Sequence, residues 1–477
     1  MEYAEEIYGP PGCGKTTYQM NVITNLIAEG FHPDRIAFLS HTRAAAGEAL
    51  SRLNMTRSDK VSTIHSLAYR MLGMGSTSLV NHTRLQEFSA KIGVPIKNGS
   101  IDSDEGIEIG DEYLGIMNKA RNSCRHPDDE YQESSRPGSL PQFQAFVKGF
   151  AEWKKANGYV DFTDMLERFL LWAEHNKLPR FEADGLIIDE AQDLSVLQWR
   201  VIDILCSQVR RVYISGDDDQ AIYVWGGADP KGMVRFGEKY GAQRRVLSQS
   251  YRVPKAVQAV ALDIIHRVGH RVDKEYAPRA ENGIVNRYGY IDSLTVAHGE
   301  DALFLCRTGA QKKEVEKWLL AEGVPYLMEG GKPGLYQTKA ANAIRAFKKL
   351  QRGDSISATE MQHLEAAIQR QHRDLVVARQ FEDLLKKDFW KVIDIPSWHM
   401  DFYRQNDVDV APTIRVSSIH GAKGREAERV VLHTGMTDRV ADGMERDPDA
   451  EHRVFYVGST RAKHQLDIVD GNSGYQI

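Results

Sequence analysis

Cysteine is scarce in this chain, and its copies stand far apart. Cys13, Cys124, Cys206 and Cys306 form no CxxC pair and no Cys/His spacing of the kind that holds zinc. We therefore expect neither a zinc site nor a disulfide framework. No run of about eighteen apolar residues occurs, and the N-terminus, MEYAEEIYGP, lacks the basic and apolar regions of a signal peptide. These absences argue against a membrane protein and predict a reduced, cytoplasmic setting.

An excess of positive charge is also missing. Lys and Arg number 61 against 66 Asp and Glu, so the net charge is −5 and the pI is about 6.4. Any contact with nucleic acid must then come from a local basic groove, because the chain as a whole has no positive field. Hydrophobic residues at 42% and charged residues at 27% are typical of a globular protein. A length of 477 residues predicts about three domains or domain-sized lobes.

Short apolar runs that end in polar residues are typical of buried parallel strands. Five such runs occupy residues 35–40, 185–189, 211–217, 301–307 and 429–435. Helix-length segments separate them, and this alternation predicts an α/β fold with the chemistry at the strand ends. Two helix-rich stretches interrupt the alternation, at about 67–159 and 334–411, and we interpret both as insertions.

The segment GPPGCGKT satisfies the GxxxxGK[ST] pattern of a phosphate-binding loop, and a helix-like segment follows it. In such a loop backbone N–H groups face phosphate oxygens, Lys15 reaches the β- and γ-phosphates, and the Thr16 hydroxyl binds Mg²⁺. A chain of this length would match the pattern by chance only about a few times in a hundred. The preceding AEEIY, with two glutamates, is a poor buried strand. We predict a nucleotide site made of Gly9, Pro10, Pro11, Gly12, Cys13, Gly14, Lys15, Thr16 and Thr17.

A second acidic site follows the apolar run LII at 186–188. Asp189 can hold the Mg²⁺ shell, and Glu190 can orient or deprotonate the attacking water. A solvated acidic strand end is the structural alternative. The next strand is followed by Gln220, placed to sense a γ-phosphate, and by the aromatic residues Tyr223 and Trp225. This order indicates hydrolysis coupled to something that stacks, although Tyr223 could equally be packed in the core.

DEAQD followed by GDDDQAIYVWGGA resembles motifs II and III of the UvrD/Rep/PcrA group of superfamily 1 helicases. The resemblance runs in order along nearly the whole chain. SHTRAAAGEAL from Ser40 is similar to motif Ia, TIHS at 63–66 to the element after it, and DFTDML at 161–166 to the acidic segment before motif II. LSQSYRVP, SSIHGAKGREAERVVL and RVFYVGSTRAK, which start at Leu247, Ser417 and Arg453, resemble motifs IV, V and VI.

The resemblance implies roles for particular side chains. Tyr251 would stack on adenine, Arg252 would touch the γ-phosphate, Glu426 would contact the ribose and Arg461 would act as an arginine finger. The two arginines would stabilise charge on the transferring phosphoryl group. A strand held without sequence readout needs stacking surfaces, and base stacking is worth about 1–3 kcal/mol per base. The residues expected to line the single-strand groove are His41, Thr42, Thr63, His65, Tyr223 and Trp225.

The resemblance also implies an architecture of two RecA-like P-loop domains with parallel sheets, each carrying a mainly helical insertion. We expect the N-terminal lobe at 1–66 and 160–250, its insertion at 67–159, the C-terminal lobe at 251–333 and 412–477, and its insertion at 334–411. The expected cofactors are ATP and Mg²⁺.

The expected activity is that of an ATP-dependent helicase moving 3′ to 5′ on single-stranded DNA. Its expected partners are single strands, single/double-strand junctions and replication or repair proteins, with no membrane, and it would act as a monomer. The alternatives are a translocase that strips proteins without unwinding, an idle nucleotide-gated DNA-binding protein, and a P-loop phosphotransferase that does not use DNA.

Overall fold

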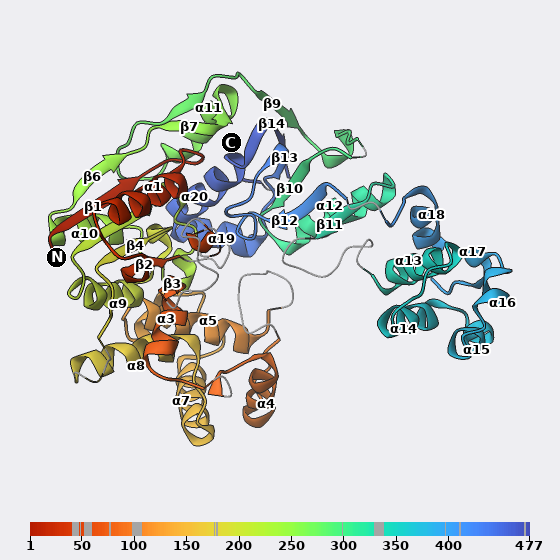
Figure 1. Ribbon diagram of the computed structural model, residues 1–477, viewed down its shortest axis with the longest axis horizontal. Helices are drawn as coiled ribbons and strands as arrows, with labels where there is room; N and C mark the ends of the chain where they lie inside the picture. The colour runs from red at the N-terminus through yellow and green to blue at the C-terminus, as the bar shows by residue number, and fades with distance from the viewer. Residues whose placement is uncertain are drawn as a thin grey trace. The chain divides into compact units, whose positions relative to one another are not determined.

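The computed structural model divides into two compact units, Met1–Asn282 with Asp442–Val457, and Gly283–Ala441 with Gly458–Ile477. Each unit holds one six-stranded sheet in which all neighbouring strands are parallel (Figure 1). The expected α/β class with two parallel sheets is confirmed. The structure describes residues 1–40, 47, 49–51, 60–75, 78–97, 107–175, 177, 180–297, 299–328, 338–395, 397–409, 412–471 and 474–477.

The sheet of the first unit has the strand order β3-β2-β4-β5-β1-β6. Side chains alternate between its faces, so Leu186 and Ile188 join one apolar cluster and Ile187 joins another. Both faces are therefore covered, as parallel sheets require. The strands are β1 (Tyr3–Tyr8), β2 (Ile36–Leu39), β3 (Val61–Ser62), β4 (Gly185–Ile188), β5 (Arg211–Gly216) and β6 (Gln243–Val246). Among the helices, α1 (Lys15–Ala28) follows β1, α3 (Ile64–Met71) follows β3, α9 (Val196–Cys206) lies between β4 and β5, and α10 (Gly232–Tyr240) lies between β5 and β6.

The prediction that AEEIY makes a poor buried strand is wrong. It forms β1, which lies between β5 and β6, and both glutamates are buried. Glu6 accepts a hydrogen bond from Arg244 Nε at 2.6 Å, and Glu5 pairs with Arg245. Burial raises the pKa of Glu6, and the bond from Arg244 offsets part of that rise. The glutamates fit here because β6 supplies a cation for each of them.

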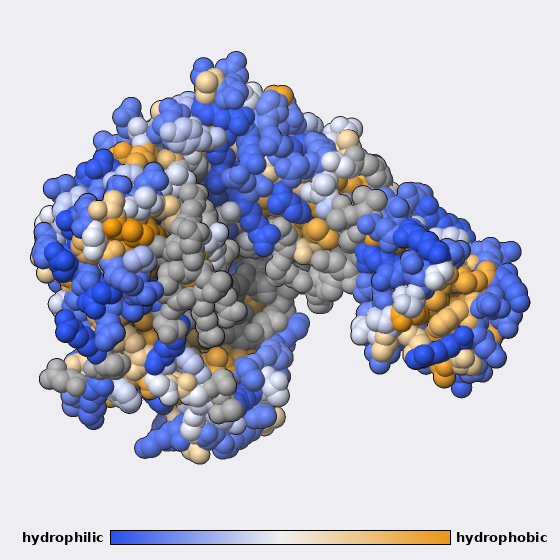
Figure 2. Space-filling model, in the orientation of Figure 1, coloured by the Kyte–Doolittle hydropathy of each residue, from blue (hydrophilic) through white to orange (hydrophobic). Residues whose placement is uncertain are grey.

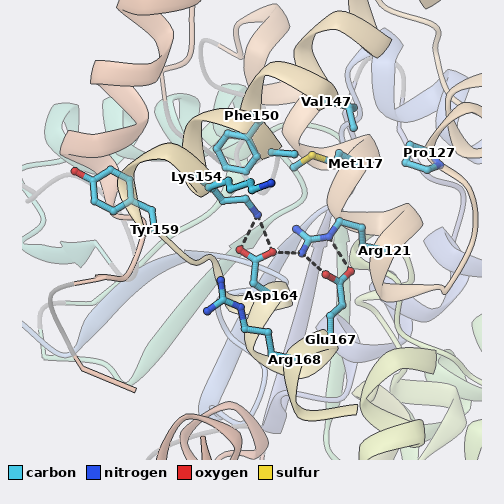
Figure 3. Close-up of a pocket in the computed structure, with 13 residues that line it drawn as sticks. Met117, Arg121, Pro127, Val147, Phe150, Lys154, Tyr159, Asp164, Glu167 and Arg168 are labelled. Atoms are coloured by element: carbon cyan, nitrogen blue, oxygen red, sulfur yellow. Dashed lines mark hydrogen bonds and ion pairs between the residues drawn. The ribbon is translucent and has the colours of Figure 1, made fainter. Parts of the chain in front are cut away.

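The first insertion contains α4 (His82–Ile92), α5 (Ile109–Asn122), α6 (Pro127–Glu133) and α7 (Leu140–Asn157) around an aromatic core. It packs on α8 (Phe162–Glu174), and a pocket of about 380 Å³ lies among α5, α7 and α8 (Figure 3). Arg121 pairs with Asp164 at 2.6 Å and with Asp161 at 2.8 Å, and Lys154 pairs with Asp164 at 2.7 Å. The acidic segment DFTDML therefore fastens the insertion to α8.

The residues after β6 are grouped differently from our expectation, which placed 251–333 in the C-terminal lobe. The structure assigns 251–282 to the first unit. This segment holds β7 (Gln249–Pro254), α11 (Lys255–Ile265) and β8 (Ala277–Arg279). Tyr251 N donates to Gly12 O at 2.9 Å, and Ser250 Oγ donates to Pro11 O at 2.8 Å. These bonds attach β7 to the phosphate loop. Residues 442–457, which we also expected in the C-terminal lobe, are likewise grouped with the first unit. The boundaries of the two insertions stay a prediction.

The sheet of the second unit has the order β11-β12-β10-β13-β14-β9. Its strands are β9 (Ile284–Tyr288), β10 (Ala302–Cys306), β11 (Tyr326–Met328), β12 (Ile414–Ser418), β13 (Ala427–His433) and β14 (Ala462–Val469), and α12 (Gly309–Ala321) follows β10. Two helices, α19 (Asp438–Arg446) and α20 (Pro448–Ser459), lie at the boundaries of the two units in the chain.

The second insertion is a helical bundle with an apolar core of its own. Its helices are α13 (Lys339–Gln351), α14 (Ala358–Ala367), α15 (Arg373–Val377), α16 (Phe381–Leu385), α17 (Phe389–Val392) and α18 (Ser397–Gln405). Figure 2 shows apolar atoms on the surface of this bundle, and Val377 is 59% exposed. In the described part of the chain, no helix combines the length and apolar character needed to cross a membrane.

Candidate nucleotide and DNA site

The phosphate loop joins β1 to α1 and folds tightly because of its glycines. Gly12 and Gly14 have φ angles of 77° and 79°, which favour glycine. A Cβ on Gly9 would lie 2.2 Å from Cys13 Sγ, and one on Gly12 would lie 2.4 Å from Arg252 Cβ. The loop therefore has no room for side chains at these two positions. Gly9, Pro10, Pro11 and Cys13 are buried, Gly12, Gly14, Lys15 and Thr16 are half-buried, and Thr17 is exposed.

Lys15 lies across this loop, with Nζ donating to Gly9 O at 2.6 Å. Burial lowers the pKa of Lys15, but its electrostatic interactions with Cys13, Glu190, Asp217 and Asp189 outweigh burial and raise the pKa overall. Lys15 is therefore held as a cation beside the acidic ends of β4 and β5. A positive charge at this position can bind a phosphate group.

The acidic pair predicted at 189–190 follows β4 directly. Asp189 is 3% exposed and accepts hydrogen bonds from Ser215 Oγ at 2.9 Å and from Glu190 N at 3.0 Å. Burial and the charge of Glu190 raise the pKa of Asp189 to about 7. Glu190 has a left-handed backbone with φ 53°, a conformation that costs a residue with a side chain about 1–2 kcal/mol. Such strain is common where a side chain must be aimed at a reacting group.

A residue that our sequence reasoning missed connects Glu190 to Gln220. Gln192 Nε2 donates to Glu190 Oε2 at 2.5 Å, and Gln192 Oε1 accepts from Asp217 N at 3.0 Å. Gln220 Nε2 in turn donates to Asp217 Oδ2 at 2.7 Å. The glutamine of DEAQD therefore bridges the ends of β4 and β5. Because Gln192 belongs to the DEAQD motif, the sequence could have indicated its role.

The oxygen ligands expected for Mg²⁺ fit the residues present. Thr16 lies in the first turn of α1, and the Asp189 carboxylate is a hard oxygen donor. Among the described residues no group of three or more His, Cys, Asp or Glu side chains could hold a metal ion by itself. Mg²⁺ commonly binds through one or two protein oxygens, with phosphates and water completing the shell. The donor set therefore suits a metal that arrives with a nucleotide.

Tyr251 and Arg252 lie beside the phosphate loop within the first unit. Tyr251 is 73% exposed, and its Cε2 atom is 4.0 Å from where a Cβ on Gly14 would be. A tyrosine ring this exposed next to the loop has a free apolar face on which a flat base could stack.

Glu426 and Arg461 lie together in the second unit, where they precede the neighbouring strands β13 and β14. Ala427 N donates to Arg461 O at 3.2 Å, and Glu426 pairs with Lys463 at 3.2 Å. Arg461 is 2% exposed. The sheet therefore brings the motif V and motif VI residues side by side.

The aromatic pair after Gln220 lies on a short turn, η5 (Val224–Gly226). The rings of Tyr223 and Trp225 are half-buried, with centroids 6.3 Å apart and planes at 67°. Asn122 Nδ2 at the end of α5 donates to Gly226 O at 3.0 Å, so the first insertion holds this turn.

Two other residues expected at the strand groove, Thr63 and His65, belong to α3 and its N-cap. Thr63 caps α3, since its Oγ1 accepts from Ser66 N at 3.2 Å. The rings of His65 and Phe162 pack with their planes at 85° and their centroids 5.7 Å apart, and Phe162 is 57% exposed. His41 and Thr42 lie outside the described residues.

A phosphate loop after one parallel strand and an acidic pair after another define a P-loop nucleoside triphosphatase. Comparison with protein families is more specific. The UvrD/REP helicase N-terminal domain matches residues 5–241, and the UvrD-like helicase C-terminal domain matches residues 376–471. These two matches span more than half of the chain, which belongs to the UvrD-like helicase family.

Individual relatives agree with this assignment. The ATP-dependent DNA helicase PcrA of Leuconostoc citreum is 26% identical in a 374-residue alignment that covers 71% of this chain and 49% of that protein. DNA helicase II of Haemophilus influenzae is 26% identical in a 361-residue alignment that covers 67% of this chain and 48% of that protein. The chain spans about half the length of the relatives it matches. A solved structure of PRRSV helicase aligns with 98% of this chain over 52% of its own length, at 10% sequence identity and a TM-score of 0.36.

Proposed function

We propose that this chain is a DNA-stimulated ATPase that moves along single-stranded DNA and separates duplex strands. The observation that carries the proposal is the short path from the acidic pair to the aromatic turn. Gln220 is bonded to Asp217, which Gln192 links to Glu190, and Trp225 follows Gln220 by five residues. A change at the phosphate end therefore has a direct route to a surface on which bases could stack. Membership of the UvrD-like family supports 3′ to 5′ movement.

In the proposed mechanism each residue has one task. Lys15 holds the terminal phosphates, Glu190 accepts a proton from the attacking water, and Gln192 keeps the Glu190 carboxylate oriented. Thr16 and Asp189 would hold Mg²⁺, which when bound would neutralise phosphate charge. Arg252 and Arg461 would stabilise the charge that develops on the transferring group, Tyr251 would stack on adenine, and Glu426 would contact the ribose.

The DNA track in this proposal runs over Trp225 and Tyr223, with His65, Thr63, His41 and Thr42 also on its path. ATP binding and hydrolysis would alternate the grip of two RecA-like lobes on the strand. The expected substrates are single strands and single/double-strand junctions, and the expected active form is a monomer.

Steady-state ATPase with and without oligo-dT tests the proposal. We expect the DNA to raise kcat at least tenfold. Glu190→Gln should lower kcat by about 10²- to 10⁴-fold, the usual contribution of a general base, while ATP binding stays within threefold of wild type. Glu182→Gln, at an exposed position outside the site, is the matched control and should behave as wild type. An ATPase rate that oligo-dT does not change would instead support a phosphotransferase. No ATP hydrolysis at all would support a nucleotide-gated DNA-binding protein without catalytic activity.

Duplexes with a 3′ or a 5′ single-stranded tail then test unwinding and polarity. We expect displacement of the strand only from the 3′-tailed duplex. A biotinylated oligonucleotide carrying streptavidin separates movement from unwinding. Streptavidin release without strand displacement would replace the helicase with a translocase that strips proteins.

A further inference from the structure

Three successive carboxylates follow β5 in the turn η4 (Asp218–Gln220) and the residue before it. Asp217, Asp218 and Asp219 are only 0%, 3% and 1% exposed. Aspartate is almost never buried without a partner, and adjacent negative charges in a poorly solvated turn repel one another. The fold must therefore bring cations to this turn.

Lys274 is the main cation. Its Nζ lies 3.1, 2.7 and 2.8 Å from carboxylate oxygens of Asp217, Asp218 and Asp219, and its side chain is 1% exposed. Arg271 adds a two-bond contact to Asp219, at 2.9 and 2.6 Å. Burial lowers the pKa of Lys274, but the three carboxylates outweigh it and raise the pKa overall. Both cations come from the segment between α11 and β8, more than fifty residues along the chain from the acidic turn.

This cluster is joined to the hydrolytic residues by direct bonds. Asp217, which Lys274 contacts, accepts the Gln220 amide at 2.7 Å, and its backbone N–H holds Gln192. Gln192 in turn holds Glu190. Displacing Asp217 would therefore disturb both Gln220 and Glu190.

The same turn is tied to α20 within the first unit. Arg453 Nε donates to Asp218 O at 3.0 Å, and Arg453 Nη2 donates to His270 O at 2.8 Å. The acidic turn, the segment before Arg271 and the middle of α20 are thus held as one assembly, which favours a fixed geometry at Asp217.

We propose that Lys274 is a positioning residue for nucleotide hydrolysis, acting through Asp217 on Gln220 and on the Gln192–Glu190 pair. Arg271 holds Asp219 in the same turn. The inference rests on the proposed function for the roles of Gln220 and Glu190 at the nucleotide. Lys274 does not touch the nucleotide in this scheme. It holds Asp217 where the Gln220 amide finds its acceptor.

The test compares Asp217→Asn with Asp218→Asn. Both changes are isosteric, and each removes one carboxylate that faces Lys274. The Asp217 carboxylate accepts the Gln220 amide, whereas the Asp218 carboxylate accepts from Val272 N and Lys274 Nζ. We expect Asp217→Asn to lower the oligo-dT-stimulated kcat at least tenfold and Asp218→Asn to lower it less than threefold. Binding of a fluorescent ADP analogue should stay within threefold of wild type in both. Unchanged kcat in Asp217→Asn, or equal losses in the two variants, would overturn the proposal because a merely structural cluster predicts no such difference.

Lys274→Met and Lys274→Arg extend the test to the cation. We expect Lys274→Met to match the kcat loss of Asp217→Asn with nucleotide binding retained, and Lys274→Arg to recover at least a third of the wild-type kcat. If thermal melting shows that Lys274→Met does not fold, the aspartate pair decides. Gln220→Ala separates the two levels of inference. If Gln220→Ala kept the wild-type kcat, the proposed role of Gln220 itself would be wrong. If Gln220→Ala lowered kcat while Asp217→Asn kept the wild-type kcat, only the positioning role would be wrong.

Discussion

Gly227→Ala tests how firmly the aromatic turn must be seated on the first insertion. Gly227 has φ 94°, and an added Cβ would lie 2.7 Å from Asn122 Cβ and 3.2 Å from Ser123 Oγ. Gly30 also has φ 94° but has nothing within 4 Å of an added Cβ. Gly226 has neither a positive φ nor a neighbour within 4 Å. Alanine at these three positions therefore separates backbone strain from collision.

The expected costs follow from those contacts. Gly226→Ala should leave the free energy of unfolding nearly unchanged. Gly30→Ala pays only the left-handed backbone penalty, about 1–2 kcal/mol. Gly227→Ala adds an overpacking cost of about 1–3 kcal/mol, because the end of α5 must move away. That movement also breaks the bond from Asn122 to Gly226 O, which is worth about 0.5–1.5 kcal/mol.

Urea denaturation and DNA-stimulated ATPase measure the two consequences. We expect Gly227→Ala to be the least stable of the three variants and to need several times more oligo-dT for half-maximal stimulation, since Trp225 lies two residues away. The KM for ATP without DNA should not change. If Gly227→Ala matched Gly30→Ala in stability and in oligo-dT requirement, the seat formed by Asn122 would have no role in placing the turn.

Three further predictions concern the first unit. Tyr251→Ala should raise the KM for ATP about tenfold while Tyr251→Phe leaves it unchanged, because stacking is worth about 1–3 kcal/mol; ATPase titrations measure both. Burial raises the pKa of Asp189 to about 7, above the unfolded value of about 3.9, so this carboxyl destabilises the fold increasingly from about pH 4 to pH 7. In metal-free buffer, Asp189→Asn should have the same melting temperature as wild type near pH 4 and a higher melting temperature than wild type above pH 7. A difference in melting temperature that did not change with pH would contradict the raised pKa of Asp189. Arg244→Met should lower the free energy of unfolding, measured by urea denaturation, by about 1–2 kcal/mol because Glu6 stays buried without its cation. This is less than the loss expected for a fully buried pair, since Arg244 is half-exposed. Adding Glu6→Gln should restore part of the lost stability.

Local patterns in the sequence were sufficient to select most residues of the candidate nucleotide site. The loop at 9–16, the acidic pair at 189–190 and Gln220 could be predicted because each is a short contiguous motif at the end of an apolar run. The five expected strands were found for the same reason, since a buried parallel strand is a local run of apolar residues. Gln192 was within reach, because it belongs to the same DEAQD segment.

Contacts between distant segments decided the rest. AEEIY is an interior strand only because Arg244 and Arg245, 238 and 240 residues beyond their glutamate partners, neutralise its charges. The turn Asp217–Asp219 can be buried only because the chain returns with Lys274, and residues 251–282 join the first unit because Tyr251 and Ser250 bond to the phosphate loop. No local pattern records which cation meets which carboxylate, because that pairing depends on the distance between side chains after folding.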